Sequence, residues 1–153
     1  MKLYLVRHGQ AVAPEVDSSQ PLSEEGHSEI EHVARTLQNM NVTLKAVYHS
    51  GKLRAEESAM ILAEALGAKK VKKHSGLAPN DEPEEALKLI QTSGTDIMLV
   101  SHLPLLDRLL RVLVNPGEDD ELPEFETSTL VALTPGDSGR WQIFRALGPT
   151  MIW

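Results

Sequence analysis

Two arginines and two histidines stand where apolar stretches of the chain end. Arg7 and His8 follow the first apolar stretch, Arg54 comes shortly after the second, and His102 comes shortly after a later one. In an open α/β sheet, the ligand crevice lies beyond the carboxyl ends of the strands, so these side chains are expected to converge there. Arginine binds phosphate oxygens through paired hydrogen bonds, and imidazole is a neutral nucleophile near pH 7. The set therefore predicts chemistry on a phosphoryl group.

A histidine can attack phosphorus without a separate base. One ring nitrogen keeps its lone pair when the other nitrogen holds the proton, so the site needs only to fix the tautomer, through a backbone carbonyl or a carboxylate. Gly9 follows His8 in the chain. Because glycine has no side chain, we expect its backbone to come close to the imidazole and to a bound phosphate.

The elements that must position these residues alternate along most of the chain. Short apolar runs predict strands, and apolar residues at three- and four-residue spacing predict helices. The expected strands span residues 2–7, 45–49, 69–73 and 96–101, and the expected helices span residues 24–40, 51–66, 84–91 and 105–114. Ser23 and Ser50 are expected to cap the first two helices, and Gly67 is expected to end the second.

The last part of the chain predicts an antiparallel pair. Residues 128–134 and 140–146 are typical of strands, and Asp137-Ser138-Gly139 between them is a turn signal. The acidic segment Asn115–Glu126 and the segment Pro79–Pro83 are expected to be loops. The whole pattern predicts an α/β fold, a three-layer α/β/α sandwich with a mostly parallel central sheet and an antiparallel edge.

Composition narrows the class of protein. A chain of 153 residues with 41% hydrophobic residues fits one domain, residues 1–153. The absence of cysteine excludes a disulfide framework, a thiol nucleophile and cysteine-ligated metal sites. A formal net charge of −7 disfavours nucleic-acid binding, and the short apolar start disfavours a membrane span or signal peptide. A cytoplasmic location is therefore expected.

Three segments, in order, resemble the motifs of the histidine phosphatase superfamily, also called the phosphoglycerate mutase-like family. The segment LVRHGQA at 5–11 looks like the family signature, and HSGKLRA at 49–55 is similar to its serine-to-arginine motif. The segment VSHLPL at 100–105 resembles the second-histidine motif of the short, SixA-type phosphohistidine phosphatases. The resemblance covers the whole chain and implies a phosphoglycerate mutase-like fold.

The resemblance implies a role for each matching residue. His8 becomes phosphorylated, Arg7 and Arg54 hold the phosphate, and His102 donates a further hydrogen bond to it. Water then hydrolyses phospho-His8. Gly9 belongs to the substrate-binding set. Because the cationic side chains neutralise the phosphoryl oxygens, neither a metal nor another cofactor is expected.

Two positions depart from the family pattern. Gln20, a substrate-binding candidate, stands where related sequences often carry arginine, so it can offer phosphate only a neutral hydrogen bond. Leu103 follows the second histidine and cannot supply the acid with which larger members protonate an alkoxide leaving group. Asp81 and Glu82, in a loop, are candidate acids, although acidic loop residues are usually only solvated.

The missing acid favours a leaving group that departs easily, such as the imidazole of phosphohistidine. No long insertion suggests a lid, so a protein substrate could reach the site. The sequence therefore predicts a monomeric, metal-independent phosphatase that acts on phosphohistidine in a protein, in signal transduction. The alternatives are a phosphomonoesterase for small molecules and a phosphate-binding module with little turnover.

The remaining histidines and charged runs are assigned no catalytic role. His27, His32, His49 and His74 show no metal-ligand spacing and are interpreted as structural or surface residues. The lysines between 69 and 73 fit a solvated edge strand, with docking of an acidic partner as the less favoured alternative. The acidic run Glu118–Glu121 lacks the ligand pattern of a calcium loop.

Overall fold

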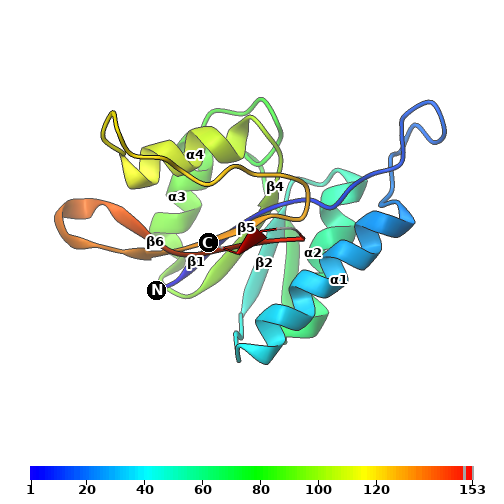
Figure 1. The fold of residues 1–153 in the computed structure, drawn as a ribbon, viewed down its shortest axis with the longest axis horizontal. Coiled ribbons are helices and arrows are strands. Elements are labelled where there is room, and N and C mark those ends of the chain that lie inside the picture. Colours follow the sequence, from blue (N-terminus) through cyan, green and yellow to red (C-terminus); the bar gives the residue numbers. More distant parts are fainter. Residues whose placement is uncertain (150, 153) are drawn as a thin grey trace.

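The fold was obtained as a computed structural model that describes residues 1–149 and 151–152. Its helices and strands follow one another in the predicted order (Figure 1). They are β1 (Leu3–Arg7), α1 (Glu24–Asn39), β2 (Ala46–His49), α2 (Leu53–Leu66), β3 (Lys70–Lys73), α3 (Glu84–Ser93), β4 (Ile97–Ser101), α4 (Leu105–Val114), β5 (Leu130–Pro135), the short 3₁₀ turn η1 (Asp137–Gly139), β6 (Trp141–Gly148) and β7 (Met151–Ile152).

The described strands form one sheet in the order β3-β2-β4-β1-β5-β6-β7. The first four of these strands pair in parallel, and β5, β6 and β7 are added in antiparallel fashion on the side of β1. The antiparallel edge was predicted, but β7 was not, because a two-residue strand carries no periodic signal. The predicted α/β fold with a mostly parallel sheet and an antiparallel edge is confirmed.

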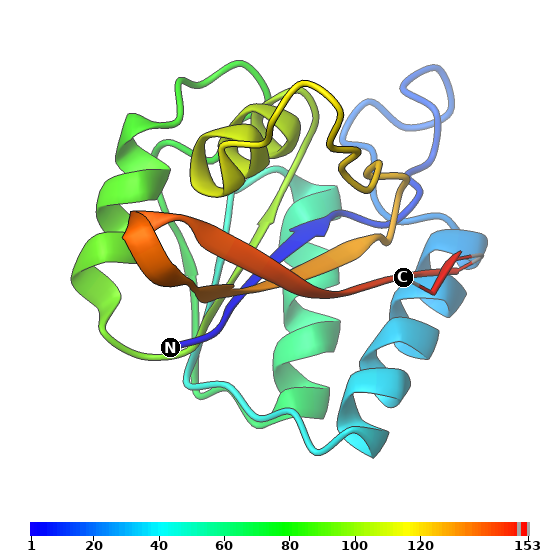
Figure 2. The same cartoon turned by 60° about the vertical axis from the view of Figure 1, so that its left-hand side comes forward.

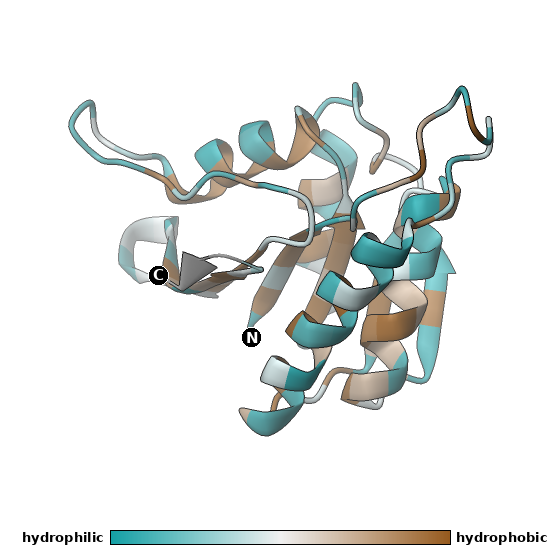
Figure 3. Cartoon of the chain, turned by 45° about the vertical axis from the view of Figure 1, so that its right-hand side comes forward, coloured by the Kyte–Doolittle hydropathy of each residue, from teal (hydrophilic) through white to brown (hydrophobic). Residues whose placement is uncertain are grey.

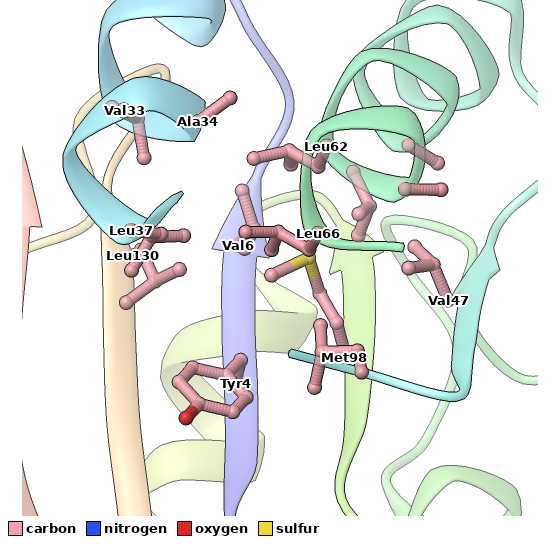
Figure 4. Packing of buried hydrophobic residues seen from close by; sticks show 14 of the residues in the cluster. Tyr4, Val6, Val33, Ala34, Leu37, Val47, Leu62, Leu66, Met98 and Leu130 are labelled. Atoms are coloured by element: carbon pink, nitrogen blue, oxygen red, sulfur yellow. The ribbon is translucent and has the colours of Figure 1, made fainter. Parts of the chain in front are cut away.

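Helices cover both faces of the sheet, with α1 and α2 on one side and α3 and α4 on the other (Figures 1 and 2). Because successive side chains of a strand point to opposite faces, β1 serves both layers. Tyr4 and Val6 pack under α1 and α2, as Figure 4 shows, whereas Leu3 and Leu5 pack under α3 and α4. The apolar colouring of the central strands and inner helix faces in Figure 3 matches this double burial.

The helix ends follow the sequence signals with one exception. Ser23 caps α1 by accepting a hydrogen bond from the Gly26 amide at 3.0 Å, and Gly67 ends α2 in the left-handed conformation. Ser50, however, does not cap α2, which begins at Leu53. Its hydroxyl is engaged elsewhere, as described below, and Gly51 follows it with a φ of 90°. A residue in that conformation cannot continue a right-handed helix.

The lysine-rich strand β3 lies at the edge of the sheet, and its four residues are exposed. Charged side chains on an open edge disfavour pairing with another chain, which is the interpretation preferred from the sequence. Among the described residues, no helix combines the length and the apolarity needed to cross a membrane.

Candidate active site

Strand register brings three chain segments to one place at the carboxyl ends of β1, β2 and β4. Arg7 is paired with Ser101 in the parallel β1–β4 ladder, so the next residues, His8 and His102, leave the sheet side by side. In the β2–β4 ladder His49 is paired with Val100, which places the exit of β2 beside that of β4. The rings of His8 and His102 lie 4.8 Å apart between centroids, with their planes tilted by 52°. The predicted convergence of the two histidines is therefore found in the structure.

The imidazole of His8 is held by the next residue in the chain. Its Nδ1 lies 2.7 Å from the carbonyl oxygen of Gly9, and since a carbonyl only accepts, Nδ1 carries the proton and donates. Nε2 then keeps its lone pair. The amide of Gly9 in turn donates to the hydroxyl of Ser58 at 2.9 Å, and that hydroxyl donates to the Arg54 carbonyl at 2.7 Å. Helix α2 thus supports Gly9, the residue whose carbonyl fixes the tautomer of His8.

Burial keeps both histidines neutral. His8 is 7% exposed and His102 is 2% exposed. Loss of hydration, together with the positive charges of Arg54 and Arg7, lowers the pKa of His8 to about 4 against the opposing effect of the Gly9 carbonyl. Burial, followed by the effects of His8 and Arg54, lowers the pKa of His102 to about 3. At neutral pH the lone pair of His8 is therefore available for attack.

His102 is oriented by a hydroxyl from the neighbouring strand end. Its Nε2 lies 2.6 Å from Oγ of Ser50, and the same oxygen accepts the Lys52 amide at 3.3 Å. Nδ1 of His102 is buried and has no hydrogen-bond partner within residues 1–149 and 151–152. A buried polar nitrogen left in this state is one that a ligand oxygen can satisfy.

The two arginines surround this pair with positive charge. Arg7 donates from Nη1 to the carbonyl of Phe125 at 2.9 Å, while its buried Nε has no partner in the described part of the chain. Arg54 lies in the first turn of α2 and is partly buried. Burial lowers the pKa of both arginines, yet a guanidinium group stays protonated in proteins. Both are close enough to His8 to lower its pKa, so they can hold an anion beside its ring.

Gly9 is required by packing against α1. A Cβ at Gly9 would lie 2.8 Å from Cγ1 of Ile30 and 3.0 Å from Cδ2 of Leu22. Gly26 shows the same close approach from the helix side, because its Cβ would lie 2.1 Å from the Gln10 carbonyl oxygen. The sequence predicts a close approach of Gly9 to the imidazole and the phosphate, whereas the contacts observed are with α1 and the chain leading into it.

Gln20 and the candidate acids have local partners. The Gln20 amide donates to the Val12 carbonyl at 3.3 Å, within the loop that joins β1 to α1. The Asp81 carboxylate accepts the Ala78 amide at 2.9 Å, within the turn that precedes α3. Glu82 is exposed. None of the hydrogen bonds in the described residues joins these three side chains to His8 or His102.

The other histidines lie outside the cluster. His27 and His32 are exposed on α1, and His49 is buried and accepts the Gly51 amide at 3.0 Å. His74 contacts Tyr48 edge to face at 5.7 Å between centroids. In the described residues, no group of three or more His, Asp or Glu side chains is arranged to hold a metal ion.

Comparisons with known proteins define the class of this α/β enzyme. The family model "Histidine phosphatase superfamily (branch 1)" matches residues 3–80, a stretch that includes Arg7, His8, Gly9 and Arg54. The chain therefore belongs to the histidine phosphatase superfamily.

Individual relatives extend the match to the rest of the chain. The phosphohistidine phosphatase SixA of Escherichia coli (strain K12) is 28% identical over 156 residues, which cover 94% of this chain and 93% of that protein. A structure of the protein histidine phosphatase SixA complexed with tungstate superimposes with a TM-score of 0.83 at 26% identity, covering 97% of each chain. A phosphoserine phosphatase mutant from Entamoeba histolytica, in complex with phosphoserine, shares the fold with a TM-score of 0.71 at 15% identity, covering 97% of this chain and 98% of that one. The similarities to SixA, together with the family model, support a phosphatase enzyme.

Three supporting residues were not identified as site residues from the sequence. Ser50 contacts His102, Ser58 contacts Gly9, and the Phe125 carbonyl contacts Arg7. Ser50 carried a signal, because it directly follows a predicted strand. Ser58 carried a weaker one, as a polar residue on the helix face that bears Ala55 and Leu62. A backbone carbonyl carries no sequence signal.

Proposed function

We propose that the chain hydrolyses phosphohistidine in a protein substrate through a phosphorylated His8. The observation that carries the proposal is the buried, neutral His8, whose Nδ1 is bound to the Gly9 carbonyl at 2.7 Å. This contact leaves Nε2 as the nucleophilic atom. The similarity to SixA, a phosphohistidine phosphatase, supports the substrate class.

In the first step, Nε2 of His8 attacks phosphorus. A nitrogen–phosphorus bond forms on His8 while the bond between phosphorus and the substrate imidazole breaks, and the released imidazole takes up a proton. Arg7 and Arg54 stabilise the phosphoryl oxygens, and His102 donates from Nδ1 to one of them. Gln20 is a further proposed contact. In the second step, water attacks phospho-His8, inorganic phosphate leaves, and Nε2 regains its lone pair.

The nature of the leaving group favours phosphohistidine over an alkyl phosphate ester. An alkoxide needs a general acid, which contributes about 100-fold or more to the rate. Leu103 follows His102, Asp81 is bound within its own turn, and Glu82 is exposed. An imidazole leaving group does not require such an acid. The phosphomonoesterase alternative would need one of these carboxylates to move toward the leaving oxygen.

The proposal is tested by trapping the intermediate. After brief incubation with a protein phosphorylated on histidine with labelled phosphate, the wild-type chain should carry an acid-labile, alkali-stable label. His8→Ala should carry none, while the matched control His32→Ala, which removes an exposed imidazole from α1, should be labelled like the wild type. Equal labelling of His8→Ala would overturn the assignment of the nucleophile.

A rate comparison separates the two enzyme hypotheses from each other and from a binding module. Phosphohistidine protein should be hydrolysed at least about 100-fold faster than aliphatic phosphate esters at neutral pH, because the esters lack a proton donor. Comparable rates would favour the phosphomonoesterase, and Asp81→Asn and Glu82→Gln would then show which carboxylate serves as the acid. Binding without turnover of either substrate would favour the module. The monomeric state, the single domain and the cytoplasmic location stay predictions.

A further inference from the structure

A groove of about 470 Å³ opens directly beside the candidate active site. Its walls are the start of α4 and the segment 122–126, which runs alongside that helix (Figures 1 and 3). Arg7 lines the groove, and its guanidinium group is bound to the carbonyl of Phe125, another lining residue. A molecule whose phosphoryl group is held by Arg7 therefore has this groove as its immediate neighbour.

Half of the groove is apolar. The apolar lining residues come from both walls and are Leu103, Pro104, Leu122, Pro123 and Phe125. Leu103 directly follows His102 and is 36% exposed, so part of its side chain is available to a bound molecule. An apolar side chain of a substrate can be desolvated against this surface, and at about 25 cal/mol per Å² of buried apolar area the contact favours binding.

The charges in the groove do not balance once a phosphate is bound. Arg111 lies 3.4 Å from the Asp107 carboxylate, so these two residues compensate each other. The positive charge of Arg7 would be shared between the phosphate and Glu126, whose carboxylate partly offsets the lowering of the Arg7 pKa by burial. Glu124 is exposed on the rim, and in the described residues it takes part in no ion pair. With phosphate on Arg7, the groove presents an acidic rim around an apolar floor.

We infer that the groove binds the residues flanking the phosphohistidine of a protein substrate, and that it selects an apolar side chain accompanied by lysine or arginine. This inference rests on the proposed function and adds to it the chemistry of the flanking sequence. The phosphoryl group occupies the histidine and arginine cluster, an apolar neighbour lies against the exposed Leu103 and Pro104, and a basic neighbour lies against Glu124. A small phosphorylated molecule would leave the groove empty.

The experiment compares short peptides phosphorylated on histidine. In one the phosphohistidine is flanked on both sides by leucine and lysine, and in the other the lysines are replaced by glutamate. The wild-type chain should show a kcat/KM about fivefold higher for the lysine peptide, the size expected for a partly exposed charge pair. Glu124→Lys should reverse the order of the two peptides.

The matched control is Glu118→Lys, which makes the same charge change within the same loop at a residue that does not line the groove. It should keep the wild-type preference. If Glu118→Lys changed the ratio of kcat/KM for the two peptides as much as Glu124→Lys does, the effect would come from net charge and the inference would be overturned. Equal kcat/KM for both peptides in the wild type would also overturn it. Binding of the same peptides to His8→Ala separates recognition from turnover. If the lysine peptide bound more tightly but the wild type hydrolysed neither peptide, the proposed function would be wrong, whereas the assignment of the groove would still hold.

Discussion

The hydroxyl of Ser50 lies 2.6 Å from Nε2 of His102, and this contact joins the exits of two neighbouring parallel strands, β2 and β4. Because Oγ of Ser50 also accepts the Lys52 amide, its own proton is free to be donated to Nε2. A neutral His102 that accepts at Nε2 carries its proton at Nδ1. That nitrogen is buried and without a partner in the described residues, so Ser50 orients the donor that the proposed phosphoryl transfer would use.

Ser50→Ala should therefore lower kcat by roughly tenfold or more while changing KM little. A misplaced donor reduces the stabilisation of the transition state more than it reduces the binding of the substrate. Ser50→Thr, which keeps the hydroxyl, should restore most of the rate. Ser28→Ala, at an exposed position of α1, is the control. A fall in melting temperature with kcat unchanged would assign Ser50 a structural role only.

The low pKa values of two of the buried histidines, His8 and His102, predict how stability depends on pH. In the unfolded chain an imidazole binds a proton below about pH 6.5, whereas in the folded chain His8 and His102 bind one only near pH 4 and pH 3. The unfolded state binds more protons between these limits. The free energy of unfolding should therefore be highest above about pH 6.5 and fall as the pH is lowered, by about 1.4 kcal/mol per pH unit for each histidine.

Urea unfolding at pH 7, 6 and 5 measures this slope. His102→Asn should reduce the slope by the contribution of one histidine, even if it also changes the free energy of unfolding at pH 7. His32→Asn removes an exposed imidazole and is the matched control. If His32→Asn flattened the slope as much as His102→Asn, the buried histidines would not be its source.

Ser58 provides a test of the support behind His8. Ser58→Ala leaves the buried Gly9 amide without its acceptor, and an unsatisfied buried amide costs about 2 kcal/mol. Ser93 is a matched control, because both hydroxyls donate to the carbonyl four residues earlier in a helix but Ser93 has no counterpart of Gly9. Ser93→Ala should cost clearly less in urea unfolding. Equal losses would mean that the Gly9 contact contributes nothing to stability.

The order of elements could be predicted because its signals are local. The apolar run at β4, the cap at Ser23 and the stop at Gly67 each depend on a few neighbouring residues. The candidate cluster could be predicted as well, since residues that follow parallel strands meet at one edge of the sheet.

The features that could not be predicted from the sequence depend on the register of the strands and on how closely the helices dock. Ser50 was interpreted as a helix cap because its partner, His102, lies 52 positions away and is reached only through the β2–β4 ladder. The packing of Gly9 depends on how closely α1 docks, which Gly26 permits. Strand β5 begins at Leu130, two residues later than expected, because Ser128 has a φ of 65°, a value that no extended strand accommodates.

The resemblance to the family suggests an arginine at the position of Gln20, and among the described residues the Gln20 amide donates only to the Val12 carbonyl, at the long distance of 3.3 Å. Gln20 has a φ of 48°, so the loop is held by its backbone shape and by the Ala11–Leu22 bridge, and replacing the side chain should leave it folded. An arginine there would add a positive charge at the position where the family resemblance implies one. We expect Gln20→Arg to lower the inhibition constant of tungstate by roughly three- to tenfold, the gain of a charge-assisted hydrogen bond that is partly screened by solvent. Gln38→Arg, at the far end of α1, adds the same charge and should change it little. Equal tightening by both variants would remove Gln20 from the substrate-binding set.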